Sequence, residues 1–143
     1  MNIRFLIPVD ERVGSVRTVN YIIKMKEAFK PVINLLTVYD VSNIEGHGLV
    51  EEIQEKIEQT AKKVAEKTLD EFVKKFEDNG ILVENSYVIK GIPGETICEE
   101  SEKLNVDMIA ISPNNESELA NILMGSVTHY VIHHSNIPTL LVK

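Results

Sequence analysis

The sequence predicts an α/β protein with one open sheet of five parallel strands and helices on both faces. Short apolar runs alternate with amphipathic stretches of helical period along the whole chain. Four of the five runs are nearly continuous in Val, Ile and Leu, which is typical of strands buried on both faces of a parallel sheet. The predicted strands are Ile3–Val9, Val32–Tyr39, Ile81–Ile89, Val106–Ile111 and Pro138–Val142.

The third run differs from the other four because it alternates in polarity. One face of this strand would carry Leu82, Glu84, Ser86 and Val88, and the other Ile81, Val83, Asn85, Tyr87 and Ile89. A period of two indicates a strand that is exposed on one face. We therefore expect the third strand at an edge of the sheet.

Apolar residues at helical spacing predict four helices between the strands. Pro31 ends the first, and Asn79-Gly80 caps the second, which is long and carries mixed charges on its outer face. The four stripes are Val16, Val19, Ile22, Ile23 and Phe29; Ile53, Ile57, Ala61, Val64, Leu69, Phe72, Val73 and Phe76; Ile97, Ser101 and Leu104; and Leu119, Ile122, Leu123, Val127, Tyr130 and Val131.

Length and charge narrow the class of protein. The 143 residues predict a single domain, residues 1–143. Fifteen Lys and Arg against 22 Asp and Glu give a net charge of −7 with His neutral, which argues against nucleic acid and anionic membranes as partners. Cys98 is the single cysteine, which indicates a reducing compartment. The apolar runs are shorter than the ~20 residues of a transmembrane helix, and the first run is not followed by a signal-peptide cleavage site. We therefore expect a cytoplasmic protein.

Three motifs stand at the positions where a parallel sheet binds ligands, the loops beyond the carboxyl ends of its strands. They are Phe5-Leu6-Ile7-Pro8-Val9-Asp10, Val88-Ile89-Lys90-Gly91-Ile92-Pro93 and Ser112-x2-Asn115-x9-Gly125-Ser126. Together they resemble the universal stress protein family, which has an acidic residue after its first strand, an x-Gly-x-Pro turn and a Gly-x2-Gly-x9-Gly-Ser/Thr segment. The resemblance spans the chain and implies a Rossmann-like sheet of the adenine nucleotide alpha hydrolase type, with strand order 3-2-1-4-5.

The resemblance also implies an adenine nucleotide site at the strand ends. Asp10 stands where the family has a carboxylate near the nucleotide, and Gly91 where the family approaches the ribose. Val38 or Tyr39 would present backbone groups to the adenine edge. The implied cofactor-binding residues are Pro8, Val9, Asp10, Val38, Tyr39, Gly91, Ser112, Asn115, Gly125, Ser126 and Val127.

Several of these residues have an ordinary structural explanation as well. Asp10 is also suited to cap the first helix or its loop. Gly91 is also suited to permit the turn before Pro93. Gly125-Ser126 is equally consistent with the start of a helix, with the glycine packed close to the sheet.

The phosphate end departs from the family pattern. Ser112 and Asn115 replace two glycines whose backbone N–H groups wrap phosphates in family members that bind ATP, and Pro113 removes a donor. Residues 112–126 contain two Glu and neither Lys nor Arg, so their charge opposes a triphosphate. We therefore expect no tight ATP binding. Binding of ATP or AMP, with Mg²⁺, is the alternative.

Other candidate sites are weaker. His129 and His133 are four residues apart and could share a metal, but the pattern lacks a metalloprotease glutamate, and we expect a solvated surface. Cys98 stands beside Glu99 and Glu100, which raise a thiol pKa, so we expect no reactive thiolate. Neither a P-loop nor a Gly-x-Gly-x-x-Gly motif is present, and we expect no enzymatic activity.

Two functions follow from the resemblance. The first is a dimeric stress-response module that acts through an unidentified protein partner without tight ATP binding. The second is a module that binds ATP or AMP, with at most slow hydrolysis. The last strand would expose unpaired backbone groups at an edge, and family members pair this strand between two chains, so we expect a homodimer. The expected interface is Ile137, Thr139, Leu140, Leu141 and Val142.

Overall fold

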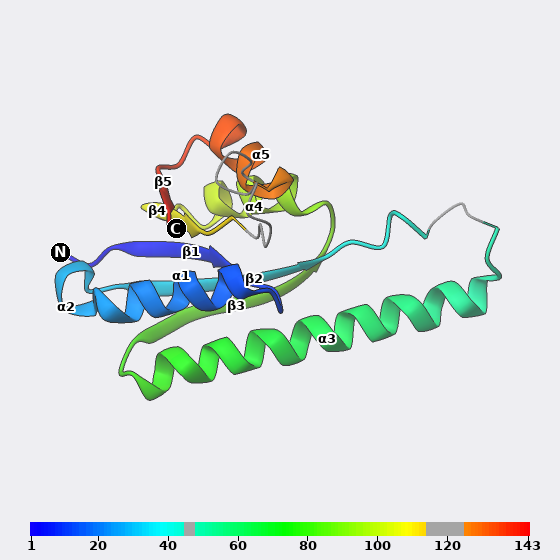
Figure 1. Ribbon diagram of the computed structural model, residues 1–143, viewed down its shortest axis with the longest axis horizontal. Coiled ribbons are helices and arrows are strands. Elements are labelled where there is room, and N and C mark those ends of the chain that lie inside the picture. The colour runs from blue at the N-terminus through cyan, green and yellow to red at the C-terminus, as the bar shows by residue number, and fades with distance from the viewer. Residues whose placement is uncertain (45–47, 114–124) are drawn as a thin grey trace.

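The computed structural model describes residues 1–44, 48–113 and 125–143 of the chain. Strands and helices alternate along it (Figure 1). The strands are β1 (Arg4–Pro8), β2 (Val32–Tyr39), β3 (Leu82–Lys90), β4 (Met108–Ile111) and β5 (Thr139–Leu141), and the helices are α1 (Val13–Lys24), α2 (Lys26–Phe29), α3 (Glu51–Asp78), α4 (Pro93–Lys103) and α5 (Ser126–His134). Within these ranges no helix is long and apolar enough to cross a membrane.

The sheet confirms the predicted topology. Its five parallel strands lie in the order β3-β2-β1-β4-β5, with β3 at an edge. On one face Phe76 of α3 and Ile22 of α1 join Ile7 in a buried cluster. On the other face Ile97 of α4 and Val131 of α5 join a second cluster. Burial of side chains this large stabilises the fold by roughly 1.5–3 kcal/mol each.

The pairing of β1 is asymmetric. β1 pairs with β2 along its whole length, from Arg4 to Pro8. It pairs with β4 only at Phe5 and Leu6. The carboxyl ends of β1 and β4 are therefore not joined by ladder hydrogen bonds, and an opening is left at the point where the strand order reverses.

The first predicted helix is divided into two helices in the structure. α1 ends at Lys24, and a short α2 follows after Met25. Lys30 then takes a left-handed conformation, with φ 46°, before Pro31 leads into β2. The fourth predicted stripe is described only from Gly125 onward, so its residues 119–123 lie outside the described part of the chain.

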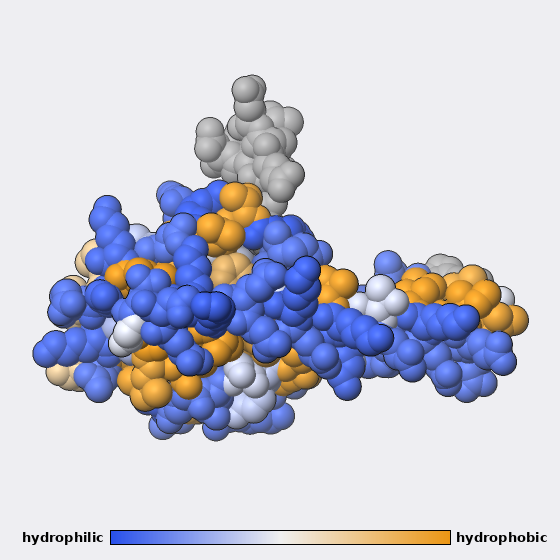
Figure 2. All heavy atoms as spheres, turned by 90° about the horizontal axis from the view of Figure 1, so that it is seen from below, coloured by the Kyte–Doolittle hydropathy of each residue, from blue (hydrophilic) through white to orange (hydrophobic). Residues whose placement is uncertain are grey.

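α3 buries only part of its predicted stripe. Phe72 and Phe76 are buried, whereas Ile53, Ile57 and Val64 are 46%, 38% and 46% exposed. The first part of the predicted stripe therefore lies outside the core, because the 28-residue helix projects beyond the sheet (Figure 1). Figure 2 shows apolar side chains on this projecting end, whose helical conformation rests on good helix formers such as Glu, Lys and Gln.

A β-bulge interrupts the alternation of β3. Ile33 pairs with Val83 but Asn34 pairs with Asn85, which leaves Glu84 as an extra residue. Beyond the bulge the faces exchange, so that Val88 packs in the same cluster as Val83. The predicted strict alternation along this strand is therefore wrong, since it placed these two valines on opposite faces.

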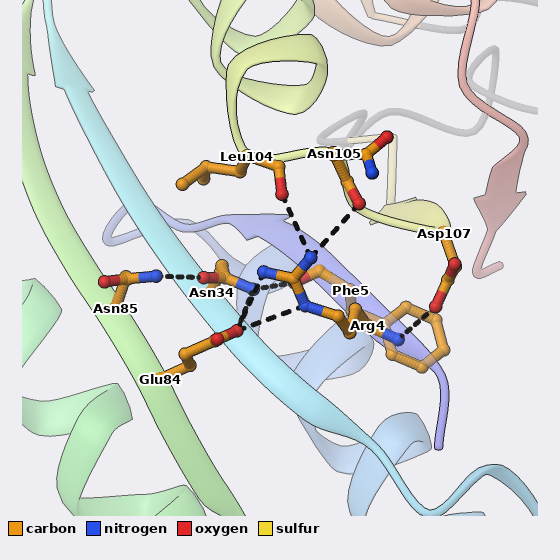
Figure 3. Close-up of polar contacts among 8 residues, drawn as sticks. All are labelled: Arg4, Phe5, Asn34, Glu84, Asn85, Leu104, Asn105 and Asp107. Carbon is orange, nitrogen blue, oxygen red and sulfur yellow. Dashed lines mark hydrogen bonds and ion pairs between the residues drawn. The ribbon is translucent and has the colours of Figure 1, made fainter. Parts of the chain in front are cut away.

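Arg4 uses the bulge to join three parts of the fold (Figure 3). Its Nε and Nη2 donate to Glu84 Oε2 at 3.2 and 3.0 Å. Its Nη1 donates to the carbonyl oxygens of Leu104 and Asn105 at 3.1 and 3.2 Å. Its backbone N–H donates to Asp107 Oδ2 at 2.8 Å. One side chain thus links β1, the bulge in β3 and the turn between α4 and β4.

Replacing Arg4 with Met removes these charge-assisted hydrogen bonds and leaves two carbonyl groups with fewer partners. We expect the free energy of unfolding to fall by about 1–3 kcal/mol, measured by urea denaturation. Lys74→Met is the control, because it removes an exposed pair with Asp78 on α3, and solvent-exposed pairs contribute little to stability. Equal losses in both variants would contradict the linking role of Arg4.

Candidate functional site

A crevice of about 490 Å³ opens beyond the carboxyl ends of β1, β2 and β4. The loops after β1 and β2, the start of α1, the middle of α3 and the starts of α4 and α5 contribute to its walls. Its size lies in the range of roughly 300–1,000 Å³ that is typical of sites for small ligands. Of the predicted site residues it is lined by Pro8, Val9, Asp10, Val38, Tyr39, Ser112, Gly125, Ser126 and Val127.

Asp10 is held by the loop that enters α1. Its Oδ1 accepts the backbone N–H of Arg12 at 2.8 Å and the hydroxyl of Ser15 at 3.3 Å. The backbone N–H of Asp10 donates to Ser15 Oγ at 2.8 Å, and Arg12 Nε lies 3.5 Å from Asp10 Oδ2. Asp10 therefore caps the loop before α1, whose N-terminus has no side-chain cap among the described residues, and the same bonds fix the carboxylate at the edge of the crevice.

Ser112 is part of a buried hydrogen-bonded chain. Its hydroxyl donates to the carbonyl oxygen of Val142 at 2.6 Å and accepts from Thr18 Oγ1 at 2.8 Å. This side chain therefore ties the end of β4 to α1 and to the residue after β5. It is occupied by the protein itself, which leaves it unsuited to bind a phosphate.

The start of α5 opens on the crevice. Gly125 is the N-cap residue, and among the described residues the first turn receives no side-chain cap. Ser126, Val127 and Thr128 line the crevice. N–H groups without a side-chain cap and the helix dipole make such an end a favourable position for an anion.

The remaining charges around the crevice are mainly negative. Asp10, Glu11 and Asp40 line it together with one cation, Arg12. Hydrogen bonds from the hydroxyl and the backbone N–H of Ser42 hold the pKa of Asp40 below its usual value, so this carboxylate is ionised at neutral pH. The field of the described walls therefore opposes a highly charged anion.

The sequence profile of the universal stress protein family matches residues 1–143. The chain belongs to this family. It is 36% identical over 94 residues to the universal stress protein MJ0577 of Methanocaldococcus jannaschii, a match that covers 66% of this chain and 57% of that relative. It is 28% identical over 140 residues to MJ0531 of the same organism, covering 98% of this chain and 81% of that relative.

Solved structures agree with this membership. The structure of MJ0577 superimposes with a TM-score of 0.86 and 30% identity, over 100% of this chain and 96% of that one. A universal stress protein family member from Arabidopsis thaliana with AMP bound has a TM-score of 0.73 at 16% identity, covering 99% and 91%. A universal stress protein in complex with cAMP shares the fold, with a TM-score of 0.66 at 19% identity over 99% of this chain and 96% of that one. A universal stress protein from Archaeoglobus fulgidus in complex with dAMP also shares it, with a TM-score of 0.65 at 17% identity over 99% of this chain and 98% of that one.

Two predicted site residues of this universal stress protein are not among the described walls of the crevice. Asn115 lies outside the described residues. Gly91 does not line the crevice, and a Cβ at this position would collide with Thr96 Oγ1, so its described role is close packing at the turn. Pro93, two residues later, lines the crevice instead.

The sequence analysis also missed part of the site. Thr18, Thr37, Ala61 and Val64 line the crevice. The two α3 residues stand in the predicted apolar stripe, which does not reveal where a helix passes the end of the sheet. For Thr37 the available signal was a hydroxyl near the carboxyl end of a mainly apolar strand.

The histidine pair lies on the surface, and Cys98 is partly buried. The rings of His129 and His133 lie edge to face, 4.2 Å apart, on an exposed part of α5. Within the described ranges, no group of three or more His, Cys, Asp and Glu is placed to hold a metal ion. Burial, followed by the charges of Glu102 and Glu99, raises the pKa of the Cys98 thiol, which opposes formation of the thiolate.

Replacing Ser112 with Ala tests the buried hydrogen bonds that join Thr18, Ser112 and Val142. The variant loses the donor to Val142 and a partner of Thr18, so we expect the free energy of unfolding to fall by about 1–3 kcal/mol in urea denaturation. Ser126→Ala is the control, because this exposed hydroxyl caps no helix, and its effect stays within about 0.5 kcal/mol. An unchanged free energy of unfolding in the Ser112 variant would show that these buried hydrogen bonds contribute nothing to stability.

Proposed function

We propose that this universal stress protein is a homodimeric cytoplasmic stress-response module that binds an adenine nucleotide with a single phosphate, acts through a protein partner and has no catalytic role. The observation that carries the proposal is the uncapped start of α5 beside a crevice of nucleoside size. The relatives described with AMP, cAMP and dAMP support the same ligand class.

The charge of the crevice favours one phosphate over three. The described walls offer one arginine against three carboxylates, and the start of α5 opens on the crevice beside them. A carboxylate about 6 Å from a phosphate charge opposes it by roughly 3 kcal/mol at an effective dielectric constant near 20. The side chain of Ser112 is occupied, and Pro113 has no N–H to donate. A single phosphate at α5 avoids most of this repulsion.

The walls on the other side suit a base and a sugar. Val9, Val64 and Ile97 supply apolar surface, and Val38 and Tyr39 end the strand that borders it. Apolar walls with a few polar groups are typical of sites that bind a planar ring and fix its orientation. The combination therefore favours the nucleoside part as the main source of affinity.

Titration of the nucleotide-free protein with AMP and with ATP by isothermal calorimetry tests this preference. We expect AMP to bind at least about tenfold more tightly than ATP, because the crevice repels the longer anion. Glu11→Gln removes one lining carboxylate and should improve ATP binding about threefold more than AMP binding. Glu27→Gln, an exposed change on α2 away from the crevice, is the control.

Two results would contradict the preference. ATP binding as tightly as AMP would show that the carboxylates do not set the ligand charge. Failure of both nucleotides to bind at millimolar concentration would remove the nucleotide from the proposed function and leave the partner-acting module.

The edge of β5 supports the homodimer. Val142 N–H donates to Ile111 at 2.8 Å, and Pro138 accepts from Ile109 at 2.9 Å, so these groups of the last strand point toward β4. Because backbone groups alternate along a strand, those of Thr139 point away from β4 and are available to a second strand. Leu140 and Leu141 are half-buried beside them. Ile137 and Val142 complete the proposed contact.

Thr139→Pro removes the outward N–H without removing a bond to β4, and edge positions of this kind tolerate proline. We expect the wild-type protein to sediment as a dimer at about 10 µM and the variant to shift toward monomer, because the ladder across the interface is interrupted. Thr139→Ala is the matched control and keeps the N–H. Sedimentation velocity decides, and a monomeric wild-type protein would contradict the dimer.

A further inference from the structure

Thr37 carries a buried hydroxyl that has no hydrogen-bond partner among the described residues. Among the described residues its Oγ1 is the one buried side-chain polar atom without a hydrogen bond, and the residue, 4% exposed, lines the crevice. The crevice hydroxyls of Ser15, Thr18 and Ser112 are bonded to other groups of the protein. Since about 90% or more of buried polar groups are paired in proteins, an unpaired hydroxyl here points to a partner from outside the chain.

Its place in the sheet separates Thr37 from the phosphate end. Ile33 and Leu35 precede it at a spacing of two residues and pack in the cluster that faces α1 and α3. Thr37 therefore belongs to the α3 side of β2, whereas Val38 packs with the cluster under α4 and α5. The start of α5, where an anion is favoured, lies on the opposite face of the sheet from this hydroxyl.

The surroundings of this side of the crevice suit a planar ring. Ala61 and Val64 of α3 line it with short apolar side chains, and Val9 lines it from the end of β1. A ring stacked on such walls leaves its edge atoms without water, so they need hydrogen bonds from the protein. A threonine hydroxyl meets this need because it both donates and accepts.

We infer that Thr37 Oγ1 hydrogen-bonds the edge of the purine base in this crevice and is a specificity-determining residue for that base. The inference rests on the proposed nucleotide site. The oxygen is shielded in the structure described, and rotation about χ1 to another staggered rotamer exchanges the positions of the hydroxyl and the methyl group. The base supplies the partner that Thr37 lacks within the described protein.

Thr37→Val keeps the shape of the side chain and removes the hydroxyl. We expect it to weaken AMP binding about tenfold by isothermal calorimetry, and adenosine binding by the same factor, because the lost bond is to the base. Thr37→Ser keeps the hydroxyl and should lose less affinity than Thr37→Val. Thr60→Val, the same change at an exposed position on α3, is the matched control and should leave both affinities unchanged.

The melting temperature without ligand gives a second measurement. Thr37→Val should melt at or above the wild-type temperature, since it breaks no bond within the described protein. A clearly lower melting temperature would show that the hydroxyl is already paired, and would overturn the inference. Wild-type-like affinity of Thr37→Val for AMP, or a loss for AMP but not for adenosine, would overturn it while the nucleotide site stands. If neither ligand binds the wild-type protein, the proposed function fails as well.

Discussion

The crevice depends on the way in which β1 is shared between its two neighbours. β1 is paired with β2 along its length but with β4 only at Phe5 and Leu6, so the sheet opens at the point where the strand order reverses. The loop after β1 and the start of α5 meet across that opening. Thr18, Ser112 and Val142 close its base with hydrogen bonds of 2.8 and 2.6 Å. The position of the crevice and its local rigidity thus follow from one feature of the topology.

Much of the fold could be predicted from the sequence because hydrophobic periodicity reports burial directly. The continuous runs placed the inner strands, and the alternating run correctly placed β3 at an edge. The bulge at Glu84 could not be predicted, since it is a shift in the pairing of β3 with β2, and polarity along one strand does not report its register with a distant neighbour. The exposed part of the α3 stripe could not be predicted for a related reason: periodicity shows that a helix has an apolar face, but not where the sheet beneath it ends.

The site was predicted less evenly. The motifs placed Asp10, Ser126 and the end of β2 at one crevice because loops beyond parallel strands converge. Individual roles could not be predicted in this way. Ser112 looked like a poor phosphate ligand, but its bond to Val142, 30 positions later, is visible only in three dimensions. The same holds for Gly91, whose contact with Thr96 is set by the geometry of the turn.

The projecting part of α3 has a consequence for the changes in length that this fold tolerates. Lys90, at the end of β3, forms an ion pair with Glu58 at 3.1 Å, and the turns before Glu58 extend past the strands (Figure 1). Residues there, such as Ile53, add nothing to either buried cluster. Shortening this stretch by whole turns would therefore remove no residue from either buried cluster, and the sheet and its two packed faces would keep their dimensions.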